Sequence, residues 1–429
     1  MRDWQRLHQE AIVADLHAHP MLKATLFRRD MGAAKFGGLS KICKLAFWPP
    51  AVRSNFPKMV EGGLDVSLST VYIPEKGWFE DLPVLKLVKW LNRFAWNNYI
   101  KPAYFDSTIR SLDLLESQAA SYNKRIEMQV FPVSGERFIT VAKTPKELDK
   151  GLKRGDLCLV HSVEGAHSLH GAKAGKPGTV VDIEKLDKDS AVSTEVLSNL
   201  DLLWQRGVAY LTLAHFYPNM CAYPCFPYPE YAFTFTKWRG LLDKWDHNMG
   251  LTATGRAVVE RMFELGMLVD VTHCTPPARA EVYKLAEHHK VKAGVIATHT
   301  GVASLNPDPY CLEDWEIKWI ADNGGVIGVI FMNHWLYPTE QHLGMKYVLK
   351  TMEHLRQVGG EDVVGIGTDF DGFTDPPDEL EDMTKLPRLT RELTAPYLSP
   401  RTAKYSDKVV KKFLGGNALR VLREGWKHG

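Results

Sequence analysis

Eight short apolar runs, spread along the whole chain, constrain its fold more than any other feature. Each run ends at a polar residue, and its hydrophobicity is nearly continuous rather than alternating. Such runs are typical of strands in a parallel sheet that is covered on both faces. The predicted strands are Ala11–Asp15, Leu64–Ile73, Asp156–His161, Val208–Leu213, Met267–Val271, Gly294–Ala297, Val326–Phe331 and Val363–Gly367.

Helical patterns separate these runs. We predict helices at Ser107–Asn123, Thr194–Arg206, Thr252–Leu265, Pro276–Lys290, Leu312–Asp322, Gly344–Val358 and about Ser406–Leu422. Eight strands with interspersed helices predict an α/β fold, either a (β/α)8 TIM-type barrel or an open doubly wound sheet. The barrel is favoured because candidate ligands follow strands from the first to the last, and only a closed barrel brings those ends together.

The length of the chain fits one barrel with long insertions. An α/β barrel can absorb all 429 residues, so we predict a single domain over 1–429. Insertions at about 21–63, 74–107, 216–249 and 374–405 are expected over the C-terminal mouth of the barrel. The third is rich in aromatic residues and proline, which suits either a wall of the active site or a packing or dimer contact.

Charge and cysteine content limit the classes of partner. The 53 basic and 51 acidic residues nearly balance, so we expect no nucleic-acid partner. No run approaches the roughly 20 apolar residues of a transmembrane segment, and none is expected. The six cysteines lack zinc-finger spacing. With no apolar signal region at the first residues, we expect reduced thiols and a cytoplasmic location.

A pair of histidines follows the first predicted strand, in Asp15-Leu16-His17-Ala18-His19. Side chains alternate along a strand, so two histidines one residue apart point to the same side and can bind one cation. Other candidate ligands follow the third, fifth, sixth and eighth strands. They are Glu164, His273, His299 and Asp369. Four imidazoles and two carboxylates around one mouth suit two divalent metal ions bridged by a carboxylate, with zinc as the expected metal.

This ligand set predicts hydrolytic chemistry. Two ions about 3.5–4 Å apart can bridge a hydroxide and polarise a carbonyl for attack. Asp369, on the last strand, is then our candidate general base, which passes a proton from the water to the leaving group. Asp371 competes for this role, but its place beyond the strand favours loop support.

Several motifs together resemble the membrane (renal) dipeptidase family of the amidohydrolase superfamily. The resemblance runs from the first-strand motif to the closing Leu414–Leu422. The motifs are Val163-Glu164-Gly165-Ala166-His167-Ser168, Leu211-Thr212-Leu213-Ala214-His215, Asp270-Val271-Thr272-His273 and Gly365-Ile366-Gly367-Thr368-Asp369-Phe370-Asp371-Gly372.

The resemblance implies a role for each motif residue. It makes Glu164 the bridge between two zinc ions, with His17, His19 and Asp369 serving one ion, and His273 and His299 the other. His215 corresponds to a histidine that contacts the substrate and the developing oxyanion, which its place after the fourth strand allows. His167 is interpreted as structural, and His161 and His170 receive no role. A homodimer is left open.

Two departures from the family pattern bear on the substrate. The family usually has aspartate where this chain has His19, so two zinc ions bring about +4 against about −3 from Glu164, Asp369 and a hydroxide. The family also places an arginine about a dozen residues after the sixth-strand histidine, to bind the substrate carboxylate. Residues 300–315 contain neither arginine nor lysine. Arg239 is the candidate substitute, although a surface position is favoured for it.

We therefore predict a metal-dependent, dipeptidase-like hydrolase of amide or peptide bonds. Its small-molecule substrate is expected to differ from a standard free dipeptide, with a blocked or absent carboxylate and a hydrophobic body. Two alternatives stay open because of His19 and the missing arginine. One is a non-hydrolytic tailoring lyase or isomerase that uses the same metals, and the other is a metal-bound binding protein on the same barrel.

Overall fold

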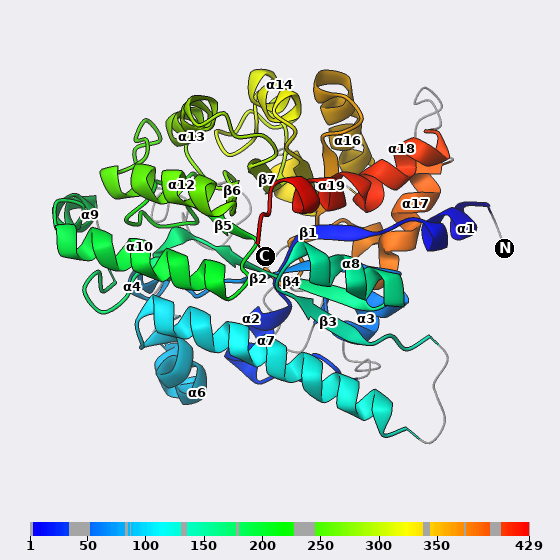
Figure 1. The fold of residues 1–429 in the computed structure, drawn as a ribbon, viewed down its shortest axis with the longest axis horizontal. Coiled ribbons are helices and arrows are strands. Elements are labelled where there is room, and N and C mark those ends of the chain that lie inside the picture. The colour runs from blue at the N-terminus through cyan, green and yellow to red at the C-terminus, as the bar shows by residue number, and fades with distance from the viewer. Residues whose placement is uncertain are drawn as a thin grey trace.

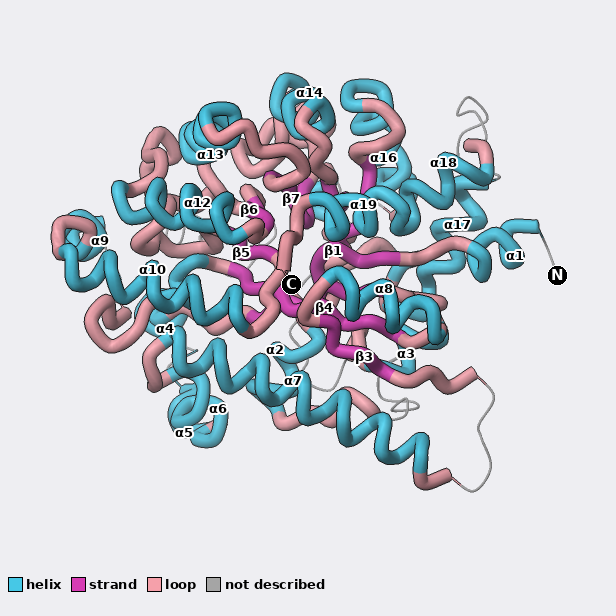
Figure 2. The backbone as a smooth tube through the Cα atoms, viewed as in Figure 1, coloured by secondary structure: helices cyan, strands magenta, loops and turns pink. Residues whose placement is uncertain are grey.

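A computed structural model describes residues 3–33, 52–81, 85, 87–129, 135–176, 180–226, 245–337, 344–372, 375–394 and 405–428 (Figures 1 and 2). The strands are β1 (Ala14–Ala18), β2 (Val66–Val71), β3 (Ile139–Ala142), β4 (Leu157–Glu164), β5 (Tyr210–Thr212), β6 (Leu268–Asp270), β7 (Val295–Thr300), β8 (Ile327–Ile330) and β9 (Val364–Gly367). The α-helices are α1 (Asp3–Glu10), α2 (Pro20–Phe27), α3 (Phe56–Glu61), α4 (Lys76–Asp81), α5 (Val88–Leu91), α6 (Arg93–Ala95), α7 (Tyr104–Glu127), α8 (Pro145–Arg154), α9 (Val180–Leu186), α10 (Ser190–Gln205), α12 (Ala253–Leu265), α13 (Pro276–His288), α14 (Asp314–Asp322), α15 (Asn333–Leu336), α16 (Met345–Gly359), α17 (Leu386–Thr394), α18 (Asp407–Lys411) and α19 (Asn417–Glu424).

Eight parallel strands close into a barrel. Their order is β1-β2-β4-β5-β6-β7-β8-β9, and the ring closes where Asp15 of β1 pairs with Ile366 of β9. Helices such as α10, α12, α13, α14 and α16 surround the strands in Figures 1 and 2. The predicted (β/α)8 barrel is therefore confirmed, and the open sheet is excluded by the β1–β9 pairing.

A ninth strand, β3, is absent from the sequence-based prediction. Its residues 139–142 pair with residues 157–160 of β4, on the edge of β4 that β5 joins only at Val163 and Glu164. The opposite edge of β4 pairs with β2. β4 is thus bonded to three neighbours, which accounts for its eight-residue length and carries its backbone as far as Glu164.

Helix-capping residues fix where the chain leaves the sheet near the site. The Thr275 side chain accepts the backbone N–H of Ala278, and Pro276 occupies the first turn, so α13 begins directly after the loop that contains His273. Pro20 likewise starts α2 directly after His19. The carboxyl ends of β1 and β6 are therefore followed within a few residues by helices, which holds the residues between them at the barrel mouth.

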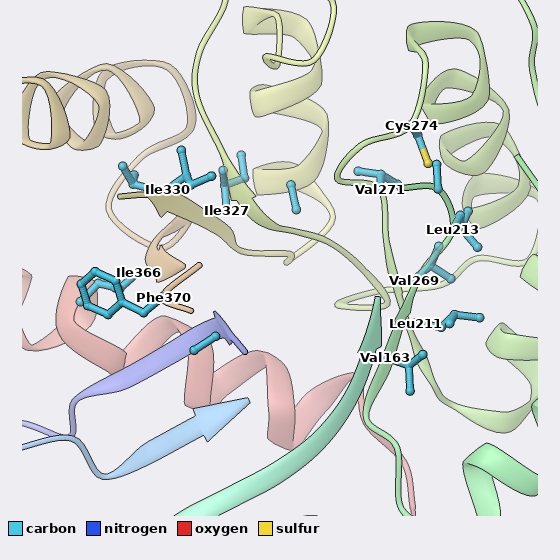
Figure 3. Close-up of a cluster of buried hydrophobic side chains, with 14 of the residues drawn as sticks. Val163, Leu211, Leu213, Val269, Val271, Cys274, Ile327, Ile330, Ile366 and Phe370 are labelled. Atoms are coloured by element: carbon cyan, nitrogen blue, oxygen red, sulfur yellow. The ribbon is translucent and has the colours of Figure 1, made fainter. Parts of the chain in front are cut away.

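The core lies between the strands and the outer helices. Figure 3 shows Val163, Leu211, Leu213, Val269 and Val271 beside one another on adjacent strands, with Cys274 at their upper end. All of these residues are fully buried. At about 25 cal/mol per Å² of apolar surface, such a continuous layer supplies much of the stability of a barrel. It also holds the strand ends rigidly relative to one another.

The predicted insertions contain helices of their own. The described parts of the first, second and fourth insertions include α2 and α3, α4 to α6, and α17. The backbone N–H groups of Arg53 and Ser54 donate to Asp371, so the first insertion reaches the carboxyl end of β9. Most of the third insertion, including Arg239, lies outside the described residues.

Two compositional expectations can be compared with the fold. None of the helices in the described ranges is long and apolar enough to cross a membrane. Five of the cysteines (158, 221, 225, 274 and 311) are free and buried. The cytoplasmic location and the assignment of 1–429 to one domain stay predictions.

Candidate metal centre

All six predicted metal ligands meet at the carboxyl end of the barrel. They come from β1, β4 and β7 and from the loops that follow β1, β6 and β9. Each is nearly inaccessible to solvent, from 0% exposure for His17 to 5% for Asp369. Buried charged and ionisable groups require close partners. The partners here are one another.

Glu164 lies at the centre of the cluster. Its Oε1 is 3.4 Å from His17 Nε2, 3.2 Å from His273 Nε2 and 3.3 Å from His299 Nε2. Its Oε2 is 3.1 Å from His19 Nε2 and 3.5 Å from His215 Nε2. One carboxylate thus faces five imidazoles, with one oxygen toward each side of the cluster.

The nitrogen atoms are arranged as they would be around cations. His17 Nε2 and His19 Nε2 are 3.0 Å apart, and His273 Nε2 and His299 Nε2 are 3.1 Å apart. Glu164 Oε1 accepts no hydrogen bond from the described residues, although three ring nitrogens lie within 3.4 Å. Imidazole nitrogens that converge on a carboxylate oxygen with no hydrogen-bond partner are the donor set of a divalent transition metal. The residues therefore fit the implied metal ions.

Three overlapping groups have their ligand atoms within 4.8 Å of one another. They are His17, His19 and Asp369; His17, Glu164 and His299; and Glu164, His215 and His273. The first group is the set that the resemblance implies for one ion. The other two groups share Glu164, and one contains His299 while the other contains His273 together with His215.

Burial and neighbouring charges shift the pKa values of Glu164 and of three imidazoles in the cluster. Burial alone would raise the pKa of Glu164, but the facing His215, His17 and His19 hold it well below its usual range. Burial lowers the pKa of His17 and of His299 to about 4, which favours the neutral form that binds metals. His19 differs, because Glu164 and Asp369 outweigh its burial and raise its pKa to about 10. A metal ion must displace that proton to bind there.

Two buried aspartates hold the ends of the ligand-bearing strands. Asp15 accepts the backbone N–H and the hydroxyl of Thr368, beside Asp369, and the backbone N–H of His17. Asp270 accepts the hydroxyls of Thr272 and Thr298, which precede His273 and His299. It also accepts the backbone N–H groups of both threonines. Each aspartate thereby joins two strand ends that present ligands.

Two residues of the centre have strained backbones. His273 and Asp369 have φ values of 67° and 54°, in the left-handed region that most side chains avoid. Such strain, which persists only where the surroundings over-determine it, is typical of functional sites. Here the hydrogen bonds of Asp270 and Asp15 to the preceding threonines hold the backbone in place.

Hydroxyl groups contact the outer nitrogen, Nδ1, of two histidines, which is the ring nitrogen that faces away from Glu164. His17 Nδ1 lies 2.8 Å from the Tyr210 hydroxyl and 3.2 Å from the Thr298 hydroxyl. The same Thr298 hydroxyl is 2.9 Å from His299 Nδ1. These contacts leave Nε2 of both rings directed at Glu164, which is the arrangement expected behind metal-binding histidines.

His215 has a different partner. Its Nδ1 lies 2.9 Å from Oε1 of Glu75, a carboxylate that is 2% exposed in the loop after β2. Burial alone would lower the pKa of His215, but Glu75 and Glu164 raise it above its usual value. The two carboxylates therefore favour the charged form of the ring, and a ring with a proton on Nε2 can donate to an oxyanion.

The other residues singled out from the sequence have structural partners. Asp371 accepts the Ser54 hydroxyl and lies 2.8 Å from the buried Lys23 ammonium, in line with the predicted loop support. His167 Nε2 contacts the carbonyl of Ile73, and His170 Nε2 accepts the backbone N–H of Met220. His161 contacts Glu116.

The stretch without arginine or lysine turns out to support the site from behind. Tyr310 is 2% exposed, and its hydroxyl donates to the carbonyl of His299 at 2.6 Å. Its ring packs against His273 and Trp335, with centroid distances of 5.2 and 4.5 Å. The position a dozen residues after His299 is therefore occupied by buried packing.

Sequence reasoning missed Glu75, and it gave Asp15 and Asp270 no role. The aspartates had a recognisable signal, since each lies near the end of a strand, two or three residues before a candidate ligand. Three of the threonines whose hydroxyls they accept directly precede the candidate ligands Asp369, His273 and His299. Glu75 follows its strand by several residues in a loop, and nothing in its spacing indicates a partner 140 positions away.

Comparison with known proteins agrees with this arrangement. The chain is 34% identical over 185 residues to an uncharacterized protein in the pqqA 5′ region of Klebsiella pneumoniae, covering 42% of this chain and 64% of that protein. The match thus spans less than two thirds of that relative. The chain is 26% identical over 337 residues to the dipeptidase verJ of Clonostachys rogersoniana, covering 77% of this chain and 69% of that protein.

A solved structure shares the fold. It is a metallopeptidase from Rhodobacter sphaeroides, bound to a phosphinate mimic of the dipeptide L-Ala-D-Ala, with a TM-score of 0.68 and 19% identity over 97% of this chain and 99% of that one. The model of the membrane dipeptidase family (peptidase family M19) matches residues 189–427, more than half of the chain. This protein therefore belongs to the membrane dipeptidase family, peptidase family M19.

Proposed function

We propose that this protein is a metal-dependent hydrolase of an amide bond in a dipeptide-like substrate. The observation that carries the proposal is the single buried carboxylate, Glu164, faced by five imidazoles at 3.1–3.5 Å, with Asp369 beside them. Membership of the membrane dipeptidase family supports the same reaction class. A metal-binding protein without catalysis would not need a further carboxylate, Asp369, and a further histidine, His215, at the same centre.

We further propose two zinc ions bridged by Glu164. His17, His19 and Asp369 would hold one ion, and His273 and His299 the other. Bound there, the ions would polarise the scissile carbonyl and lower the pKa of the attacking water. The facing Nε2 atoms, 3.0 Å apart in one pair and 3.1 Å in the other, support this division.

Asp369 is the proposed general base. Its Oδ1 lies 3.3 Å from His19 Nε2 and 3.9 Å from His17 Nε2, so it faces the centre of the cluster. In that place Oδ1 can take the proton of the attacking water and return it to the nitrogen of the leaving amine. His215 Nε2, on the opposite side of Glu164, is the proposed donor to the oxygen of the tetrahedral intermediate.

For the substrate we propose an amide whose C-terminal carboxylate is absent or blocked. The position of the family arginine falls in residues 300–315, where Tyr310 supports His299 instead. A free carboxylate buried without a cation costs several kcal/mol, so a neutral group fits this side of the site better. Arg239 is the one residue that we single out as a substitute, and it lies outside the described residues.

Replacement of Asp369 by asparagine tests the function directly. The amide side chain would keep the shape of the carboxylate but could not accept a proton, so we expect the D369N variant to lose about 10²- to 10⁴-fold in turnover. Metal content, measured by elemental analysis, should stay near that of the wild type. Unchanged turnover would overturn the assignment of the base.

A substrate panel tests the reaction class and the substrate together. The zinc-loaded protein should release amino acids from dipeptide amides or esters faster than from the matching free dipeptides. A preference for free dipeptides would contradict the proposed substrate while leaving the hydrolase in place. Full metal occupancy without turnover on any amide would instead favour a non-hydrolytic enzyme or a binding protein.

A further inference from the structure

A buried carboxylate, Glu75, lies directly behind the histidine proposed to contact the oxyanion. Its Oε1 accepts His215 Nδ1–H at 2.9 Å and the backbone N–H of Phe216 at 3.1 Å. Its Oε2 accepts the indole N–H of Trp78 at 3.1 Å and the hydroxyl of Tyr72. Four donors thus saturate both oxygens, and Glu75 cannot itself reach a substrate.

These contacts determine the state of the His215 ring. Because Glu75 takes Nδ1–H, the other nitrogen, Nε2, is turned toward Glu164, 3.5 Å from its Oε2. The ring is also held between neighbours, with centroid distances of 4.4 Å to Tyr72 and 4.7 Å to His273. A histidine fixed in this way has one ring orientation.

Among the described residues, His215 is set apart from the other histidines of the cluster. Nδ1 of His17 and of His299 contacts hydroxyl groups, and Nδ1 of His19 and of His273 has no hydrogen-bond partner within the described ranges. Among the described histidines of the cluster, His215 alone has a carboxylate beside its Nδ1. A carboxylate that accepts Nδ1–H fixes the orientation of the ring, so Nε2 stays aimed at one place.

We propose that Glu75 is a positioning residue that acts through His215, by fixing the orientation of its ring and aiming Nε2 at the tetrahedral intermediate. The proposal rests on the proposed function, because it assigns the oxyanion contact to His215. It adds a residue from a different part of the chain, the loop after β2, to the machinery of the site. It also explains why a fully buried carboxylate is maintained there with four donors.

The E75Q variant tests the proposal. Glutamine keeps the size and one acceptor but removes the charge, so kcat should fall about 10- to 100-fold while KM stays near that of the wild type. Affinity for a tetrahedral probe, the phosphinate analogue of alanyl-alanine or of its C-terminal amide, should fall by the same factor in calorimetry. Metal content should change little. Thermal stability should fall, because the new amide N–H would face the donors that Glu75 accepts, so kcat and affinity are compared at a temperature at which both proteins are folded.

Two further variants separate positioning from a general structural role. In the H215A background, E75Q should have little additional effect, because residues that act as a unit are not additive. The matched control is E116Q, which removes the charge from another contact between a buried histidine and a carboxylate, His161 Nε2 to Glu116 Oε1 at 3.1 Å. E116Q should leave kcat and phosphinate affinity unchanged.

The outcomes distinguish this proposal from the proposed function. An E75Q variant with wild-type kcat and phosphinate affinity, or one whose loss persists in the H215A background, overturns the role of Glu75 alone. A wild-type protein that binds the phosphinate without hydrolysing amides overturns the hydrolase but still measures Glu75 through binding. A wild-type protein that does neither overturns both.

Discussion

At the scale of single residues, the metal centre depends on side chains that are not themselves ligands. Asp270 has both carboxylate oxygens engaged by three threonines, Thr212, Thr272 and Thr298. Two of these threonines belong to the segments that present His273 and His299. A hydrogen bond to a buried carboxylate contributes more to stability than an ordinary hydrogen bond, about 1.5–3 kcal/mol for each bond.

The D270N variant should therefore lose both stability and metal. The new amide N–H would face hydroxyl donors and backbone N–H groups, so we expect about 2–4 kcal/mol lower unfolding free energy in chelator. Metal affinity should fall about 10- to 100-fold, because His273 and His299 lose their positions. Denaturant unfolding and zinc titration would measure the two effects.

The matched control is D189N, at a position where asparagine serves as well as aspartate. Asp189 caps α10 by accepting the backbone N–H of Ala191. D189N should leave metal affinity unchanged and alter stability by only a few tenths of a kcal/mol. Wild-type metal affinity in D270N would show that the ligands are held by other contacts.

The meeting of the candidate ligands at one place could be predicted from the sequence, and the residues that support them could not. Each candidate ligand lies two to four residues beyond the end of a predicted apolar strand, a pattern that a parallel barrel converts directly into proximity. Asp15 and Asp270 lie within the same motifs, but their roles depend on hydrogen bonds to a neighbouring strand. Those contacts follow from strand order and register, which the sequence does not state.

At the scale of elements, strand positions were predictable where burial is complete on both faces. The exception is β3, in which Thr140 and Val141 are only half-buried and whose four residues pair with half of β4. The prediction also ended the third barrel strand at His161, whereas β4 continues to Glu164 because Val163 and Glu164 pair with Leu211 and Thr212. Pairing with a partner strand, and not local composition, sets such ends.

A buried histidine, His170, joins two loops of the barrel by a hydrogen bond. His170 follows the turn after β4 and is fully buried, and its Nε2 accepts the backbone N–H of Met220 in the loop after β5. Burial, with a smaller contribution from the nearby His167, lowers the pKa of His170 to about 3. The folded chain therefore keeps this ring neutral, and the unfolded chain does not.

This link should make stability fall in mild acid. The unfolded-state pKa of about 6.5 lies above the folded value, so the unfolded chain binds the extra proton as the pH falls from about 6.5 toward 3. The contribution of His170 is complete above pH 7 and decreases by about 2 kcal/mol by pH 5. Urea unfolding in chelator, compared between wild type and H170Q, would measure it.

The H170Q variant keeps an acceptor for the Met220 N–H but cannot take up a proton. Its unfolding free energy should run parallel to that of the wild type above pH 7. Below pH 6.5 it should fall less steeply, closing the gap by about 1.4 kcal/mol per pH unit. Identical slopes over pH 5–7 would mean that His170 titrates alike in both states.

At the scale of the whole molecule, the metal centre joins strands from both ends of the chain. Its candidate ligands come from five of the eight barrel strands or the loops after them, β1, β4, β6, β7 and β9. The backbone N–H of Asp369 donates to the carbonyl of His17 at 2.8 Å. The contacts between β1 and the end of β9 that close the barrel therefore also hold His17 and Asp369 together. Metal binding and the closed barrel should therefore be thermodynamically linked.

Zinc should accordingly stabilise the whole barrel in a single transition. At free zinc about 1,000 times the dissociation constant, the unfolding free energy should rise by about 4 kcal/mol over that in chelator. Because the donors span the barrel, far-ultraviolet circular dichroism and tryptophan fluorescence should shift together. The E164Q variant, which lacks the central charge but keeps its shape, should lose most of this zinc-dependent gain. A shift seen by only one probe would mean that the metal stabilises a local segment, and that the strands can separate without releasing it.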